Sequence, residues 1–160
     1  MDIILRKTEV TDLDNVLNAE NHPENSSYVY QWSFDEHKTS LSDLNILHYI
    51  ICDQNNEFYG YVILDNLQDT SRSVNLRRIV ITKKGMGIGY IVLQKIQEIA
   101  FNELKIHRLW LDVFVDNNRA YELYKKVGFR LEGTLIDSYL RNNSYISQHI
   151  MAKLQSEYIA

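Results

Sequence analysis

The residues best suited to chemistry form a glycine-rich segment between an apolar, β-branched run and an amphipathic run. It reads Lys84-Gly85-Met86-Gly87-Ile88-Gly89. Glycines at alternate positions let the backbone approach a ligand closely with its N–H groups free. A helix that begins here adds the positive end of its dipole, so the junction suits a phosphate or pyrophosphate. Three glycines alone are equally compatible with a turn that binds no ligand.

A second pattern follows an alternating apolar run. It reads Asn117-x-x-Ala120-x-x-Leu123-Tyr124-x-Lys126-x-Gly128-Phe129. Residues 116–118 offer an N-cap and Gly128 a C-cap, which predicts a helix over about 118–127. Tyr124 shares one face of this helix with Ala120 and Val127. By spacing alone, Tyr124 is therefore interpreted as a core residue.

With both segments in this order, the chain resembles the GNAT superfamily of N-acetyltransferases along nearly its whole length. The segment 128–135 is similar to the branch of ribosomal-protein N-terminal and polyamine acetyltransferases. The resemblance implies direct acetyl transfer from acetyl-CoA to a primary amine, either a small molecule or polyamine or a protein N-terminus. A CoA-binding regulatory module without turnover is the alternative. A dinucleotide or P-loop enzyme fits poorly, because the glycine spacing differs and no Lys-Ser/Thr follows.

The resemblance also assigns roles to residues. Tyr124 would lie beside the acetyl-CoA sulfur and protonate the departing thiolate. The strand before the glycines would splay from its neighbour and offer main-chain groups to the pantetheine arm. Lys84 stands where the family usually has Arg or Gln, and keeps the charge without the bidentate fork. The residues expected to bind the cofactor are Ile79, Ile81, Lys84, Gly85, Met86, Gly87, Ile88, Gly89, Asn117 and Lys126. Asn117 either bonds the pantetheine or only caps the second helix.

The general base is not evident from the sequence. Glu20 and Glu24 lie near the end of the first predicted helix, where the family's acceptor loop lies, and are candidates for the base or for a cation site. Asp112 alternates within an apolar strand and is interpreted as a solvated or capping residue. Tyr30 and Trp32 belong to an aromatic cluster expected either to line the acceptor pocket or to pack against the sheet. The five histidines show no metal-ligand spacing, so no metal is expected.

Hydrophobic periodicity predicts the elements that position these residues. Apolar runs typical of strands lie at residues 3–5, 48–52, 58–64, 74–81, 109–115, 129–136 and 147–154. Helical spacing lies between Thr11 and Glu20, and over about 34–44, 88–104 and 118–127. This order predicts an α/β fold: a single GNAT-like domain over 1–160, with a mixed, mostly antiparallel sheet of six to seven strands flanked by about four helices.

Composition narrows the class of partner. The net charge of −4 provides no electrostatic reason for binding nucleic acid or an anionic membrane. No apolar run approaches the roughly 20 residues of a membrane span, and no signal peptide is visible. Cys52 is the single cysteine, so no disulfide forms within the chain, and a cytoplasmic location is expected. An exposed closing strand would allow pairing between subunits, so a homodimer is possible.

Overall fold

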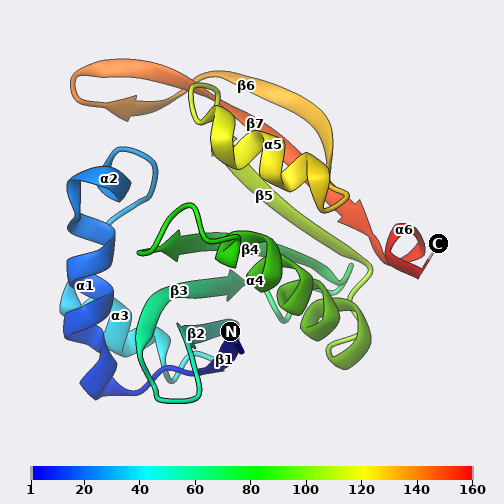
Figure 1. Cartoon of the computed structure of the whole chain (residues 1–160). Coiled ribbons are helices and arrows are strands. Elements are labelled where there is room, and N and C mark those ends of the chain that lie inside the picture. The colour runs from blue at the N-terminus through cyan, green and yellow to red at the C-terminus, as the bar shows by residue number, and fades with distance from the viewer. Residues whose placement is uncertain (1, 160) are drawn as a thin grey trace.

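A computed structural model describes residues 2–159 as a seven-stranded sheet with helices on both faces (Figure 1). The strands are β1 (Ile4–Lys7), β2 (Ile46–Cys52), β3 (Phe58–Asp65), β4 (Ser73–Ile81), β5 (Arg108–Phe114), β6 (Arg130–Arg141) and β7 (Ser144–Leu154). Their order is β1-β2-β3-β4-β5-β7-β6. Only the β4–β5 pair is parallel among the described strands. The predicted mixed, mostly antiparallel sheet is confirmed.

The helices are α1 (Leu13–Asn21), α2 (Pro23–Ser26), α3 (Phe34–Ser40), α4 (Ile88–Gln97), α5 (Asn118–Lys126) and α6 (Gln155–Ile159). The short helix α2, which the helical spacings did not include, forms because proline suits the first helical position and His22 caps it. The predicted helix over 88–104 changes at Glu98 into a π-helical turn that ends at Glu103. The short α6 was not predicted.

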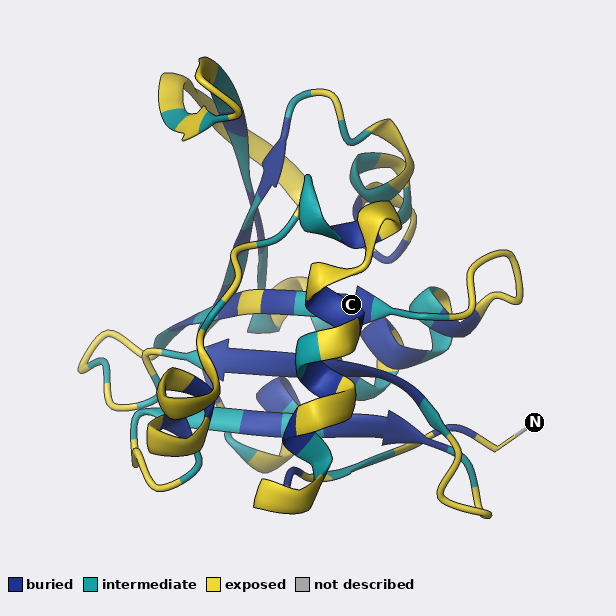
Figure 2. Cartoon of the chain, turned by 90° about the vertical axis from the view of Figure 1, so that its left-hand side faces the viewer, coloured by how far each residue is buried: buried dark blue, intermediate teal, exposed yellow. Residues whose placement is uncertain are grey.

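Side chains on successive strand positions separate the core into two layers. Val62 and Leu64 on β3 pack with residues of α4 and α5, while Tyr61 and Ile63 pack with residues of α1 on the opposite face. This alternation is the two-residue period of a strand buried on both sides. Figure 2 shows the resulting dark blue, buried centre of the sheet between exposed helix surfaces.

The sheet opens between β4 and β5. The two strands pair only from Ser73 opposite Arg108 to Asn75 opposite Trp110, and β4 then continues to Ile81 alongside β3 alone. A register shift in the β3–β4 pair leaves Arg77 without a partner residue, which indicates a bulge at the point where the strands diverge. Figure 1 shows β5 turning away from β4. The splay that the family resemblance implied is therefore present.

The last two strands form a long hairpin at the edge of the sheet. It extends beyond β5 toward α2 (Figure 1), and β6 is the outermost strand, paired only with β7 among the described residues. Nearly every residue of β6 is exposed. Both strands are longer than the predicted runs, since β6 continues to Arg141 and β7 begins at Ser144. No helix within residues 2–159 is long and apolar enough to cross a membrane.

Candidate active site

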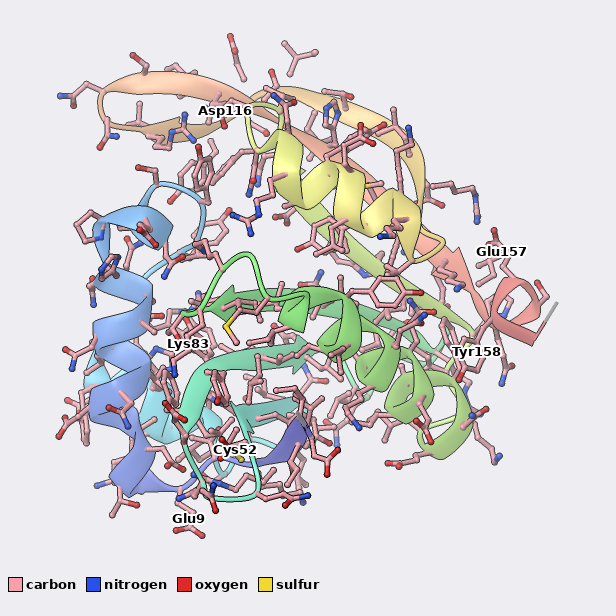
Figure 3. All side chains as sticks on the ribbon, in the orientation of Figure 1. Glu9, Cys52, Lys83, Asp116, Glu157 and Tyr158 are labelled. Carbon is pink, nitrogen blue, oxygen red and sulfur yellow. The ribbon has the colours of Figure 1, made fainter. Side chains whose placement is uncertain are left out.

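A pocket of about 900 Å³ occupies the opening between β4 and β5. Every residue predicted to bind the cofactor lines it except Met86, whose side chain is 50% exposed and lies outside the lining. Figure 3 labels Lys83 just after β4 and Asp116 just after β5, on the two sides of this opening. The two sequence motifs, about 30 residues apart, therefore meet at one cavity because the strands that precede them are neighbours.

The glycine segment forms an open cradle at the start of α4. Gly85 and Gly87 have φ angles of 81° and 73°, a left-handed conformation that glycine adopts without strain. Gly87 is the N-cap of α4, and no side chain of residues 2–159 caps the helix there. A Cβ on Gly89 would lie 3.0 Å from Leu123 Cδ2, so glycine lets α4 pack closely on α5. The exposed N–H groups and the helix dipole together suit a pyrophosphate.

Two of the predicted cofactor residues already have partners inside the protein. Lys84 Nζ donates to Asn25 Oδ1 at 2.7 Å and to the Ile81 carbonyl at 3.2 Å. Burial lowers the pKa of Lys84, and the nearby charge of Arg119 lowers it further. Asn117 Oδ1 accepts from the Ala120 N–H at 3.4 Å, so this residue caps α5. Because Asn117 also lines the pocket, capping leaves its amide nitrogen available to a ligand.

Tyr124 and Asp112 line this pocket from α5 and β5. Burial raises the pKa of the Tyr124 phenol, and the charge of Asp112 raises it further. Burial also raises the pKa of the Asp112 carboxyl, although Arg77 and a hydrogen bond from Gln148 partly oppose this. The interpretation of Asp112 as a solvated or capping residue is wrong. The signal for its true position was an acidic residue alternating into an otherwise apolar strand directly before the Asn117 motif.

The residues predicted to bind the acceptor separate into two groups. Glu24 and Tyr30 line the pocket, and the Tyr30 ring meets Tyr139 edge-on with ring centroids 4.9 Å apart. Glu20 and Trp32 do not line it. Glu20 is completely buried, and its carboxylate is bound by four protein groups. The prediction of Glu20 as a base or cation site is therefore wrong, since no oxygen of its carboxylate reaches the cavity.

The chain matches known acetyltransferases over almost its full length. It is 27% identical to the spermidine N(1)-acetyltransferase of Vibrio cholerae over 98% of this chain and 95% of that protein. It is 28% identical to the L-amino acid N-acetyltransferase AaaT of Escherichia coli K12, over 96% of this chain and 99% of that protein. A crystal structure of the Vibrio enzyme in complex with CoA and spermine superposes with a TM-score of 0.90, at 28% identity, covering 99% of this chain and 98% of that one.

A family model fits the part of the chain that builds the pocket. The acetyltransferase (GNAT) family model matches residues 9–129, from the segment before α1 to the end of the Asn117 motif. No group of three His, Cys, Asp or Glu side chains within residues 2–159 is arranged to hold a metal ion. The splayed strands, the glycine cradle and the buried tyrosine are joined in one cavity. The chain belongs to the acetyltransferase (GNAT) family and is an acetyl-CoA-dependent N-acetyltransferase.

Proposed function

We propose that Asp112 is the general base and Tyr124 the general acid of this acetyl transfer. The observation that carries the proposal is that both groups line one pocket and lie close enough for the charge of Asp112 to raise the pKa of Tyr124. In this role the Asp112 carboxylate takes a proton from the acceptor ammonium, so that the amine nitrogen can attack the thioester carbon. The Tyr124 hydroxyl then gives its proton to the departing sulfur.

The protein environment raises the pKa of both Asp112 and Tyr124. A raised pKa makes Asp112 a stronger base than an aspartate in water, because burial disfavours the charged form. Tyr124 is protonated at neutral pH, as an acid must be before the sulfur departs, since its pKa lies above the ordinary tyrosine value of 10.0. The cradle at Gly85 and Gly87 would hold the pyrophosphate, and the open edge of β4 at Ile79 and Ile81 would bond the pantetheine arm as an added strand would.

The acceptor end of the pocket is proposed to take a small-molecule amine, a polyamine or a protein N-terminus. The similar proteins named above act on spermidine and on L-amino acids, and another, 25% identical, is a putative alanine acetyltransferase of ribosomal protein bS18 in Bacillus subtilis. Here the acceptor end carries Tyr30, Arg77, Asp112 and Asp116, and Arg141 pairs with Asp116 at 2.5 Å. Neither Asp112 nor Glu24, the remaining carboxylate of the lining, has such an ion-pair partner among residues 2–159. Glu24 is exposed, whereas Asp112 is partly buried and its charge acts on Tyr124, so Asp112 is the carboxylate proposed to meet the acceptor ammonium.

A panel of amines tests this proposal directly. Spermidine, spermine, free amino acids and short peptides with a free N-terminus are each incubated with acetyl-CoA and the protein, and release of CoA is followed. We expect saturable turnover with at least one class and its loss in Asp112→Asn. If no amine is acetylated while CoA still binds tightly, the chain is a CoA-binding module, and the proposed roles of Asp112 and Tyr124 are refuted.

We also propose that two copies associate through the β6 edge. Large apolar side chains are exposed along the β6–β7 hairpin: Leu131, Leu135, Ile136, Leu140 and Tyr145. An edge strand with free backbone groups and exposed apolar residues is a template for pairing with another chain. The same edge on a second copy supplies matching chemistry, since a two-fold dimer joins identical surfaces.

A further inference from the structure

Four hydrogen bonds converge on the buried carboxylate of Glu20 from four different elements. Its Oε1 accepts from the backbone N–H of Trp32 at 3.1 Å and from His37 Nε2 at 2.9 Å. Its Oε2 accepts from the Tyr61 hydroxyl at 2.6 Å and from Arg78 Nη1 at 3.1 Å. These partners belong to the segment before α3, to α3, to β3 and to β4. A carboxylate has about four lone-pair positions, and here all four are used.

The network continues from α3 to the first strands of the sheet. His37 Nδ1 lies 3.0 Å from His48 Nε2, and His48 Nδ1 lies 2.8 Å from Thr8 Oγ1. Burial lowers the pKa of His48 to about 3, with help from the charges of His37 and Arg78, so its imidazole is neutral. Because a carboxylate only accepts, His37 must donate its Nε2–H to Glu20. The orientation of α3 is thus tied to that of α1 and β2.

Trp32 is held at two points by this network. Its backbone N–H donates to Glu20, and its ring lies against the Arg78 guanidinium, whose carbon is 4.7 Å from the ring centroid. Arg78 is itself buried and paired with Glu20, while its Nε and Nη2 have no hydrogen-bond partner within residues 2–159. The Trp32 ring also packs on His37, with ring centroids 5.3 Å apart. Loss of Glu20 would therefore release both the main chain and the ring of Trp32.

Trp32 ends a segment that forms one wall of the acceptor pocket. Residues 27–33 contain no helix or strand, and Tyr28, Val29 and Tyr30 within them line the pocket. Arg141 holds the start of the segment by donating to the Ser27 carbonyl at 3.1 Å. Glu20 holds its end through Trp32. A wall segment with two anchors keeps the aromatic side chains between them in place, which matters because small misplacements at a reacting centre are costly.

We propose that Glu20 is a positioning residue that fixes residues 27–33 and thereby sets the affinity for the acceptor amine without touching it. This inference rests on the proposed acceptor site, and it assigns Glu20 a part in the reaction other than base or cation ligand. Glu20 does not line the pocket and none of its four hydrogen-bond partners belongs to the glycine cradle, so we expect its loss to affect the acceptor more than the cofactor.

The test compares Glu20→Leu with a matched core variant, Ile50→Ala. Ile50 is also fully buried in the α1 layer and lies outside the pocket lining. We expect Glu20→Leu to raise the acceptor KM tenfold or more, with the Kd for CoA within twofold of wild type. We also expect chymotrypsin to cleave faster at Tyr28, Tyr30 or Trp32. Ile50→Ala, at a similar loss in Tm, should leave the acceptor KM within twofold.

Two results overturn the proposal: an unchanged acceptor KM in Glu20→Leu, or an equal rise in KM in Ile50→Ala. If Glu20→Leu does not fold, Glu20→Gln replaces it, since the amide keeps the size of the side chain and turns one accepting oxygen into a nitrogen donor that faces two donors. It should raise the acceptor KM at least threefold, and an unchanged value is equally decisive against the proposal. Proteolysis needs no turnover. Faster cleavage without any acetyl transfer by the wild type would therefore refute the proposed function and leave the anchoring by Glu20 standing.

Discussion

In the proposed mechanism, the two partly or fully buried groups Asp112 and Tyr124 carry out opposite proton transfers. For both side chains the protein raises the pKa, because burial disfavours the carboxylate and the phenolate alike. A carboxylate buried without an ion-pair partner lowers the stability of the fold, and the same environment increases its basicity. Function and stability therefore oppose each other at this position, and a single substitution can separate them.

Replacing Asp112 by Asn is expected to abolish catalysis and to preserve or increase stability. The raised pKa means that the folded state disfavours the charged carboxyl, so the stability contribution of Asp112 falls as pH rises from about its ordinary 3.8 through the higher folded pKa. At pH 7 the neutral amide removes that unfavourable contribution. We expect kcat/KM to fall by about 10² or more, with Tm equal to or above wild type. A parallel loss of Tm and activity would mean that Asp112 has a structural role only.

Replacing Tyr124 by Phe is expected to lower kcat by about 10², the usual scale for a positioned acid, with little change in the Kd for CoA. The ring still packs on Phe129, so the fold should persist. In the wild type, kcat/KM should rise with pH as Asp112 loses its proton, and Tyr124 should cause no fall below about pH 10, since its pKa is raised from that value. Wild-type kcat in the variant, with chemistry rate-limiting, would leave Tyr124 as a core residue.

The place of a single residue in the structure could be predicted where a sequence motif surrounds it. It could not be predicted where contacts with residues far along the chain determine it. Tyr124 lies within a motif shared with the family, so its position at the pocket was predicted through the resemblance and not from spacing alone. Glu20 was assigned to the acceptor because it lies near the end of α1. Its partners Trp32, Tyr61 and Arg78 are 12, 41 and 58 residues away. No local pattern reports such contacts, because they form only when four elements pack together.

At the scale of elements, hydrophobic periodicity located most helices and strands and did not reveal their departures from regularity. The last part of the predicted helix over 88–104 is a π-helical turn instead of an α-helix. In this turn the Leu104 N–H donates to the Ile99 carbonyl at 2.8 Å, five residues back. The bulge at Arg77 was likewise not predicted by any pattern in the sequence. The splay between β4 and β5 was anticipated only through family resemblance, because strand divergence depends on pairing across the sheet.

The start of α4 permits a test of the cofactor cradle. Gly87→Val introduces a β-branched residue at a φ of 73°, which costs about 1–3 kcal/mol and disturbs the N–H groups of the cradle. Acetyl-CoA at a hundredfold excess over Kd should stabilise the wild type by about 2.7 kcal/mol. We expect that thermal shift to disappear in Gly87→Val and to persist in Met86→Ala, whose side chain lies outside the pocket. Equal stabilisation of the wild type by ATP would argue against a CoA site.

At the scale of the whole molecule, the β6–β7 hairpin contacts residues beside the pocket and also forms an exposed edge of the sheet. Arg141 on this hairpin contacts Ser27 and Asp116, so the hairpin is tied to two segments beside the proposed acceptor end of the pocket. Apolar residues are also exposed along β6, among them Leu131, Leu135, Ile136 and Leu140. A second copy bound to the β6 edge would restrict the motion of the hairpin, which lies beside the proposed acceptor end of the pocket. Oligomeric state and acceptor binding should therefore be coupled.

Ile136 is the most exposed apolar residue of this edge, at 77%, and its substitution tests the proposed dimer. We expect the wild type to have about twice the 18.9 kDa monomer mass at tens of micromolar, measured by light scattering after size exclusion. Ile136→Glu should give the monomer mass, because opposed edges would place two like charges in an apolar contact. Leu44→Glu, at a residue 81% exposed between α3 and β2, is the matched control and should remain dimeric. A wild-type monomer under the same conditions would refute the interface. Monomers from both variants would instead indicate a general effect of added charge.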